Sequence, residues 1–505
     1  MNNSYTKSIY TSYLRTFLQV AIAIFLTPFI LQYISKAEYG SYSLAQSTIL
    51  LLGLINFGFG GALNVFVSRN TDDTALVSKY ASITATFQVL LGTIGLIFGI
   101  FLSFKFVDWF KIEAQTDFEI QLVVILFSIG FFITMITQTY TSLLTAYRQI
   151  HIDNLIGIFT MIINSLLIIL FLHFEIGILG MAISVLITQS ISGLLVVYRV
   201  HKYLHNLKIS YFKVDKAGFK ELFQLGIWFF VGSLSIIFIE KFDQILAGKI
   251  INVETVAILI ITAKLFELVR GLIYSISNNF RPYLGKMVGD GESLKAYNYY
   301  VLLRKVSILA SILCACIIIY INKIFVGFWV GSEFYGGDFL TIALGLNLVY
   351  YCWKLPTRAF LTSNLIVKEQ SLYSFLEGLI NLGTSLFLGL KFGIIGIISG
   401  TFISGFIFQL IIYGIILNNK KLETWAVYIK NNIKLLLQTT MLIGFSIFMT
   451  HDFPADVEHI GVLFIKSLAF VTVLLTLLLL FNIKDLKLLY SLKSNPSFKH
   501  EPTQT

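Results

Sequence analysis

The chain has 505 residues, of which 56% are hydrophobic and only 13% are charged. A soluble domain carries about 25% charged residues, so this composition excludes an ordinary soluble protein and indicates an integral membrane protein. The net charge of +10 would suit a nucleic-acid-binding protein, but in a membrane protein it is expected of the cytoplasmic loops.

Fourteen apolar stretches are each long enough to cross the hydrocarbon core of a bilayer, which takes about 20 residues in a helix. We therefore predict an all-α integral membrane protein with about 14 transmembrane helices. Because the chain contains only six prolines, we expect few of these helices to be broken. In chain order the predicted spans are residues 16–34, 42–64, 82–104, 119–141, 155–172, 177–198, 222–242, 255–280, 304–322, 338–358, 369–390, 394–417, 433–450 and 461–482.

The Lys and Arg residues between the spans predict the orientation of the chain. With the N-terminus in the cytoplasm, 26 of the 37 basic residues lie on the cytoplasmic side and 8 on the outer side. This asymmetry is typical of membrane proteins, so we predict that both termini are cytoplasmic. The polar N-terminal stretch leads into a span without a small-residue cleavage site, so we expect no cleaved signal peptide.

Three short sequence matches indicate an internal repeat. The run from Tyr33 resembles the run from Lys249, and GILG at Gly177 matches GIIG at Gly393, both at an offset of 216 residues, while LTAY at Leu144 faces LTSN at Leu361. Six helices per repeat give both halves one orientation, with a pseudo-twofold axis along the membrane normal. We therefore predict an N-terminal six-helix lobe (1–200), a cytoplasmic linker (201–220), a C-terminal six-helix lobe (221–418), two additional transmembrane helices (419–483) and a cytoplasmic tail (484–505).

The predicted span 255–280 is unusual because it carries charged residues near its middle. Each charge at that depth costs about 2.5–3.5 kcal/mol on insertion scales, so several in one span need an explanation. One explanation is that they line a cavity, where the cations meet an anionic ligand. The alternative is a self-neutralising ladder at i, i+3 and i+6 that aids insertion or joins two helices. At about 100° per residue, the polar face comprises Lys264, Glu267, Arg270, Tyr274, Asn278 and Arg281.

Two further charges lie inside predicted spans of the second half. Lys354 is either a second cation of the cavity or a side chain that reaches the cytoplasmic surface beside Arg358. Glu377 must be protonated or paired at its depth. It is a candidate for binding a coupling proton or ion, or else it forms a structural pair with Lys354 or Lys264.

The ends of two spans carry the remaining candidate residues. Glu240 and Asp243, at the outer end of span 222–242, form an outer gate or coupling-ion site with Lys241 and Lys249, or a plain interfacial cluster. Arg15 lies at the start of the first span. It either binds a phosphate group of the ligand at the cytoplasmic opening of the cavity, or it is only one of the basic residues expected on the cytoplasmic side.

Several function classes are disfavoured by missing motifs. We find no nucleotide-binding loop, zinc-ligand spacing or nucleophile elbow, so we expect neither an enzyme nor a cofactor beyond possible H⁺ or Na⁺ coupling. We interpret the basic run 199–220, in and beside the predicted linker, as a consequence of the positive-inside rule and not as a nucleic-acid site, and contact with anionic lipid head groups is a further option. The three cysteines lie in apolar spans and are expected to be inert.

Residues 25–69 and the stretch from Trp228 resemble the Wzx-type polysaccharide-unit flippases, whose superfamily includes the multidrug (MATE) antiporters and the lipid II flippase. The resemblance covers about residues 10–417. It is carried by a proline in the first helix, a turn ending in Tyr-Gly, a polar-Gly pair in the second helix and an acidic residue between the seventh and eighth: Pro28, Tyr39, Gly40, Asn56, Gly58 and Asp243.

The resemblance implies two six-helix bundles around a central cavity in a multi-pass protein of the bacterial cytoplasmic membrane. It implies a substrate of the undecaprenyl-diphosphate-linked oligosaccharide type, transported by alternating access, with polysaccharide polymerases and glycosyltransferases as possible partners. One alternative is a drug or ion antiporter of the same superfamily, although the Leu-rich spans after residue 433 suit a groove for a long lipid tail. A membrane polysaccharide polymerase or ligase is disfavoured because no large outer loop is present. Since the counterpart of the charged span in the first half carries no charge, we expect the anionic part of the substrate to lean toward the C-terminal lobe.

Overall fold

The computed structural model describes residues 2–112, 117–212 and 215–451, together with positions 470, 472, 473 and 476. All regular structure in this part is helical, and eight helices are long and apolar enough to cross a membrane. The chain is therefore a multi-pass, all-α membrane protein. The predicted last span, 461–482, lies outside the described residues except for those four positions, as does the predicted tail 484–505.

The first thirteen predicted spans each coincide with one or more helices. Span 42–64 is divided among three of them, and span 255–280 between two. In chain order the helices are α1 (Asn2–Tyr33), α2 (Lys36–Leu50), the 3-10 helix η1 (Leu51–Asn56), α3 (Phe59–Arg69), α4 (Thr74–Phe110), α5 (Asp117–Ala146), α6 (Ile150–His173), α7 (Gly177–Tyr203), α8 (Lys216–Glu240), α9 (Phe242–Ile250), α10 (Val253–Thr262), α11 (Lys264–Gly289), α12 (Ser293–Trp329), the 3-10 helix η3 (Ser332–Phe334), α13 (Asp338–Ser363), α14 (Val367–Ile407), the π-helix η4 (Phe408–Ile412), α15 (Tyr413–Asn419) and α16 (Trp425–His451).

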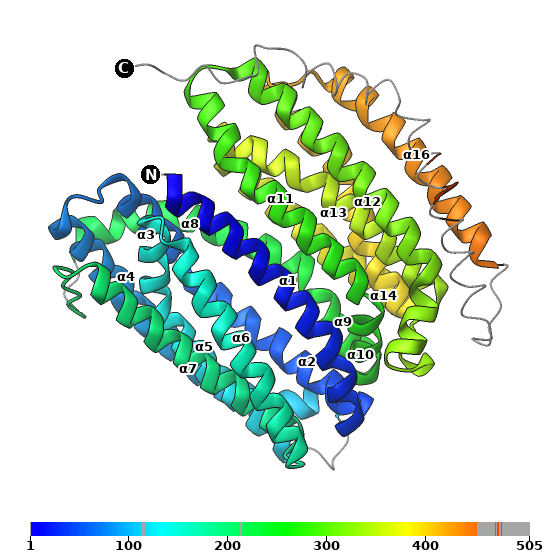
Figure 1. Ribbon diagram of the computed structural model, residues 1–505, viewed down its shortest axis with the longest axis horizontal. Helices are drawn as coiled ribbons and strands as arrows, with labels where there is room; N and C mark the ends of the chain where they lie inside the picture. The colour runs from blue at the N-terminus through cyan, green and yellow to red at the C-terminus, as the bar shows by residue number, and fades with distance from the viewer. Residues whose placement is uncertain are drawn as a thin grey trace.

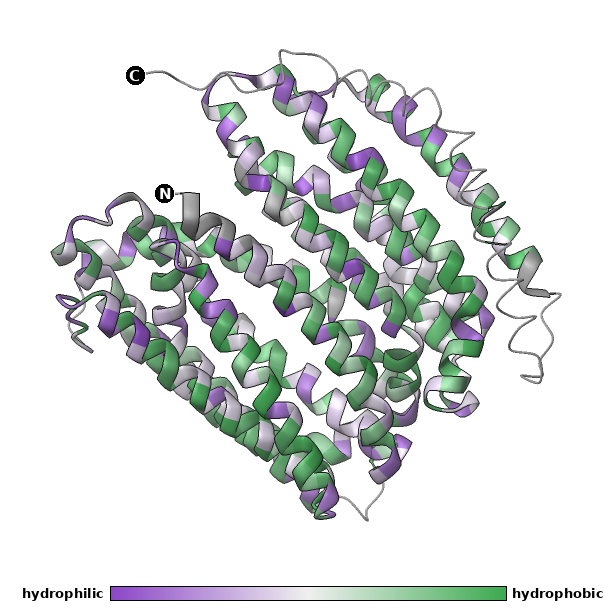
Figure 2. Cartoon of the chain, viewed as in Figure 1, coloured by the Kyte–Doolittle hydropathy of each residue, from purple (hydrophilic) through white to green (hydrophobic). Residues whose placement is uncertain are grey.

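The helices pack in two groups (Figure 1). In the first, α4 packs on α5, α5 on α7 and α1 on α6; in the second, α12 and α11 pack on α13, and α13 on α14. The groups meet where α2 contacts α10 and where α3 contacts α8. Hydrophobic residues run along the helices, and hydrophilic ones are more frequent toward their ends (Figure 2). Helix α4 shows why this suits a bilayer, because its exposed face is apolar and carries Ile94, Ile97, Phe101 and Phe104.

Among the described residues few predicted spans are broken, and the interruptions in spans 42–64 and 255–280 occur without proline. Helix α2 passes through η1 and is separated from α3 by Phe57 and Gly58, both with positive φ. A Cβ on Gly58 would lie 2.1 Å from the carbonyl oxygen of Gly226 on α8, so the break permits a backbone contact between α3 and α8. By contrast, Pro28 and Pro356 lie within the intact helices α1 and α13. The break at Phe57 and Gly58 is therefore accompanied by a tertiary backbone contact and not by a proline.

The backbone agrees with the repeat offset at two places. Gly177, before the main part of α7, has φ 60°, and Gly393, inside α14, has φ 62°. Arg148 and Leu365, which are 217 residues apart, also share a left-handed conformation, with φ 58° and 61°. At Gly393 the chain reverses, since Ser385 Oγ donates a hydrogen bond to the carbonyl of Ile397 at 2.9 Å. Helix α14 is therefore a hairpin of two limbs that matches the two predicted spans 369–390 and 394–417.

The connection between α7 and α8 begins with a strap that lies along α4. We define the strap as residues 204–212. Its backbone N–H groups at positions 208, 210 and 212 donate to hydroxyls spaced one helical turn apart on α4, namely Ser78, Ser82 and Thr86. Beyond the strap, Lys79 Nζ lies 2.7 Å from Asp215, and this contact together with the backbone N–H of Gly218 holds the pKa of the Asp215 carboxyl below its usual value.

We expect Gly40→Ala to destabilise the contact between α2 and α10. A Cβ at Gly40 would lie 2.0 Å from the carbonyl oxygen of Val253, a backbone atom that cannot turn aside. Overpacking of this kind costs about 1–3 kcal/mol. The matched control is Gly53→Ala, because a Cβ there meets nothing within 4 Å. Thermal unfolding of the purified variants measures the difference, and equal melting temperatures for the two would contradict the close packing.

Candidate functional site

Two adjoining cavities lie between α1 of the first group and helices of the second. Their volumes are about 380 and 460 Å³, and Gln19, Glu267, Arg270, Gly271 and Tyr351 line both. The first extends toward α9, α10 and the second limb of α14, whereas the second extends along α11 and α13 toward the predicted cytoplasmic end. Because they share a wall, we describe them together as the central cavity.

Among the described residues, the charged side chains that line the central cavity all come from the part of the chain after α8. Helix α1 contributes the uncharged Thr16, Gln19, Val20 and Ala23. The described lining opposite α1 holds five cations and two carboxylates, a formal excess of positive charge: Lys241, Lys264, Arg270, Arg281 and Arg358, with Asp243 and Glu267.

Helix α11 supplies the largest share of this charge. The predicted span is broken at Ala263, so Lys264 opens α11 and Glu267 stands in its first turn. Lys264, Glu267, Arg270, Tyr274 and Arg281 all line the central cavity, on the face that their spacing predicts. At 1.5 Å per residue, Lys264 and Arg281 are roughly 25 Å apart along the helix axis, so the cations of α11 line both parts of the cavity.

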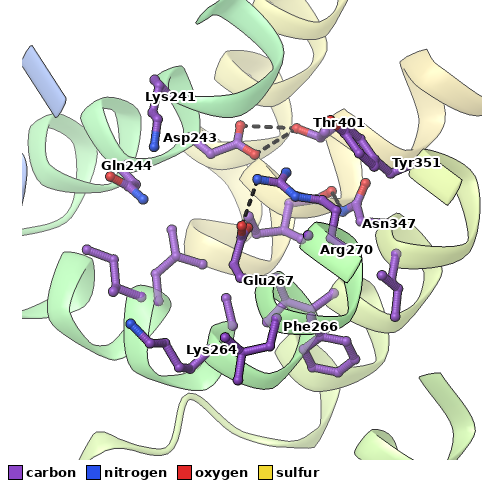
Figure 3. Close-up of a pocket in the computed structure, with 18 of the residues that line it drawn as sticks. Lys241, Asp243, Gln244, Lys264, Phe266, Glu267, Arg270, Asn347, Tyr351 and Thr401 are labelled. Carbon is purple, nitrogen blue, oxygen red and sulfur yellow. Dashed lines mark hydrogen bonds and ion pairs between the residues drawn. The ribbon is translucent and has the colours of Figure 1, made fainter. Parts of the chain in front are cut away.

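Glu267 and Arg270 form an ion pair within the cavity. Arg270 Nη2 lies 2.7 Å from Glu267 Oε2, and its guanidinium stands over the Tyr351 ring at 4.7 Å (Figure 3). The other cations are differently placed. Within the part of the chain that the structure describes, Lys241, Lys264, Arg281 and Arg358 make no side-chain hydrogen bond or ion pair. They are therefore available to an anionic ligand, which charge-assisted hydrogen bonds would hold.

Asp243 faces the cavity from α9 and contacts Thr401 on the second limb of α14. Both carboxylate oxygens lie close to the Thr401 hydroxyl, at 3.0 and 2.9 Å (Figure 3). A hydroxyl carries one proton and donates it to one oxygen at a time. One oxygen of Asp243 is therefore left as an acceptor for a proton or a cation.

Lys354 and Glu377, which the sequence offered as separate candidates, form one buried cluster. Lys354 Nζ lies 2.6 Å from each oxygen of Glu377, and the Tyr350 hydroxyl also donates to that carboxylate. The side chains of Lys354 and Glu377 are 4% and 1% exposed. Neither lines the central cavity, but Tyr350 lines its first part. The cluster thus lies behind the cavity wall.

Arg15 stands apart from the other candidates. It lies on α1 but packs on α6, where its guanidinium is 3.4 Å from Asp153 and from Asn154 and covers the face of Gly157. It does not line the central cavity. The side chain of Glu240 lies outside the described part of the structure.

Arg358 is the main cavity residue that sequence reasoning missed. The predicted span ends at Arg358, which places this residue at the cytoplasmic surface, whereas α13 continues to Ser363 and holds Arg358 against the second part of the cavity. Its spacing of four residues from Lys354 and eight from Tyr350 was the available signal, since such residues share one helix face.

Solved structures with the same fold are membrane transporters. The lipid II flippase MurJ in an inward closed conformation is 17% identical, with a TM-score of 0.70 over 94% of this chain and 99% of that chain. An inward-facing multidrug resistance MATE family transporter of the MOP superfamily is 16% identical, with a TM-score of 0.59 over 81% of this chain and 93% of that chain. A MOP superfamily transporter from Pyrococcus furiosus is 14% identical, with a TM-score of 0.56 over 81% and 94%. Among curated proteins, none matches the chain.

The helical architecture and the polar cavity within it therefore define a multi-pass membrane protein with the fold of the MOP-superfamily transporters. The chain belongs to the polysaccharide biosynthesis protein family, whose model matches residues 6–288. This membership confirms the family resemblance seen in the sequence.

Proposed function

We propose that this protein flips lipid-linked oligosaccharides, built on an undecaprenyl diphosphate, across the cytoplasmic membrane of a bacterium. The observation that carries the proposal is the one-sided excess of positive charge in the central cavity. A diphosphate is a compact polyanion, and arginine and lysine side chains hold phosphate oxygens by charge-assisted hydrogen bonds. Tyr274 and Tyr351 add aromatic surfaces on which sugar rings can pack. Membership of the polysaccharide biosynthesis family supports the same substrate class.

The geometry suits transport by alternating access. The cavity lies between the two groups of helices, so a change in their relative position would open it to one side of the membrane or the other. For the whole chain we propose fourteen spans, two six-helix lobes related by a pseudo-twofold axis, and cytoplasmic termini. A cation-coupled drug antiporter of the same superfamily is the second candidate, because that fold also occurs among multidrug transporters. The cationic cavity favours the first candidate, since a site for cationic drugs would carry net negative charge.

Reconstitution of the full chain tests the proposed function directly. Proteoliposomes containing a fluorescent undecaprenyl-diphosphate oligosaccharide are expected to expose the lipid at the opposite leaflet faster than protein-free liposomes do. Undecaprenyl monophosphate and a cationic dye serve as competing substrates. Accumulation of the dye without movement of the diphosphate lipid would support the antiporter instead.

We expect Asp243→Asn to abolish any dependence of transport on pH or Na⁺. The reason is that an amide neither releases a proton near neutral pH nor binds Na⁺ as a carboxylate does. Transport rates are measured in proteoliposomes with imposed proton or sodium gradients. Thr401→Val is the comparison variant, because it removes the hydroxyl contact and keeps the carboxylate. Coupling through Glu377 is tested by Glu377→Gln, and unchanged gradient dependence in both carboxylate variants would refute coupling at these sites.

A further inference from the structure

We infer that Lys354 is a positioning residue for the central cavity: it holds the Glu377 carboxylate in a buried ion pair and so leaves the Arg358 guanidinium available to the anionic substrate. This inference rests on the proposed function, because it concerns how one cation of the cavity is kept available. Lys354 itself does not line the cavity.

The placement of three residues on α13 is the first part of the argument. Tyr350, Lys354 and Arg358 follow at intervals of four residues and therefore share one face of the helix, about 6 Å apart along its axis. Tyr350 lines the first part of the cavity and Arg358 the second. Lys354 lies between them and reaches away from the cavity to Glu377 on the first limb of α14.

The second part of the argument is that both carboxylate oxygens of Glu377 already have hydrogen-bond donors. Lys354 Nζ contacts both carboxylate oxygens at 2.6 Å, and the Tyr350 hydroxyl donates to Oε1 as well. Arg358 lies four residues beyond Lys354 on the same face of α13 and is the next cation along that face. Nevertheless, among the described residues its side chain forms no ion pair or hydrogen bond. Lys354, on the same face of α13, is the cation that pairs with the Glu377 carboxylate.

The fixed position of Tyr350 makes the cluster rigid. A Cβ on Gly405, in the second limb of α14, would lie 2.1 Å from Tyr350 Cζ, so the ring packs directly on that backbone. Tyr350 therefore touches one limb of α14 through Glu377 and the other through Gly405. These contacts hold Glu377 in place. Without Lys354, the Arg358 side chain would turn toward this carboxylate, because an unpaired charge in a buried site is strongly unfavourable.

Binding of farnesyl diphosphate to the purified full chain in nanodiscs tests the inference. Lys354→Met frees the carboxylate to pair with Arg358, and we expect the affinity of the folded protein to fall at least tenfold. The double variant Lys354→Met/Glu377→Gln also removes the carboxylate that would otherwise pair with Arg358. Its affinity is expected to recover to within about threefold of the native affinity, because Arg358 is again available to the ligand. Glu377→Gln alone, which keeps an acceptor for Tyr350 and Lys354, is expected to bind at least as tightly as the native chain.

Stability and affinity are recorded on the same samples, because removal of one partner also destabilises a buried pair. A purely structural pair would lower the melting temperature of Lys354→Met while its folded fraction bound the diphosphate normally, and that result overturns the inference. A tenfold loss of affinity in Glu377→Gln also overturns it, and this measurement stands even when Lys354→Met does not fold. Failure of the native chain to bind farnesyl diphosphate would overturn the proposed function itself. Weakened binding in Arg358→Ala combined with native binding in Lys354→Met would overturn the inference alone.

Discussion

Replacement of Glu423 by alanine is expected to destabilise the protein by about 3–5 kcal/mol, because it leaves a buried guanidinium without its counter-charge. Arg304 on α12 forms two bonds with Glu423, Nη1 to Oε2 at 2.9 Å and Nη2 to Oε1 at 3.0 Å. The two side chains are 1% and 0% exposed. The rings of Tyr300 and Tyr428 lie 4.8 and 5.1 Å from the guanidinium, so aromatic side chains also pack against it. We expect loss of folded protein from the membrane and a large drop in melting temperature.

The same chain offers a matched control for this effect. Glu369 and Lys420 form an ion pair at 2.5 Å with side chains 38% and 41% exposed. Exposed pairs contribute about 0–1 kcal/mol, so Glu369→Ala should leave the melting temperature nearly unchanged. Arg304→Met/Glu423→Leu removes both buried charges and is expected to recover much of the stability lost in Glu423→Ala. A single Glu423→Ala variant as stable as the Glu369→Ala variant would show that the buried pair contributes little.

Alanine at Lys264 or Arg270 is expected to reduce transport severely while the protein remains in the membrane. One hydrogen bond to a charged group contributes about 1.5–3 kcal/mol, which is roughly a ten- to hundredfold change in affinity. Arg270→Ala should be the more severe, because it also leaves Glu267 in the cavity without its partner, and that carboxylate would repel an anionic substrate. Surface polysaccharide in complemented cells and flipping in proteoliposomes are the two measurements.

Lys286→Ala is the control for these variants. Lys286 lies in the last turn of α11, is exposed and does not line the central cavity, so its loss changes net charge equally without touching the site. Normal transport by Lys264→Ala or Arg270→Ala would exclude that residue from substrate binding. If the variants instead disappear from the membrane, the charges of α11 serve insertion or helix packing, which is the alternative that the sequence left open.

The sequence was most informative about features that depend on a single helix. The face of α11 that lines the cavity follows from a rotation of about 100° per residue, which needs no knowledge of neighbouring helices. The break at Ala263 was not predictable, because nothing local marks it. The backbone approach of Gly58 to Gly226 likewise depends on two helices far apart in the chain.

The sequence also did not show which charged side chains pair with each other. Glu377 had two possible cations, Lys354 and Lys264, and only the packing of α13 on α14 selects the first. Arg358 was missed because hydropathy ended the span too early, although α13 runs five residues further. The strap escaped prediction because its partners are hydroxyls on α4, which are common in membrane helices and carry no distinctive signal.

Helix α8 has a mechanical consequence for any movement of the two groups. Near its start, Leu222 is buried in the core of the first group and Glu221 meets the hydroxyl of Tyr80. Toward its end, α8 packs along α14, where the ring centroids of Phe238 and Phe375 are 6.3 Å apart. Because α8 contacts one group near its start and the other toward its end, it couples their movements. A tilt of the groups requires that α8 lose one of these contacts or bend at Lys241, where it joins α9. The predicted lobe boundary at residue 220 falls near the start of α8, the helix that contacts both groups.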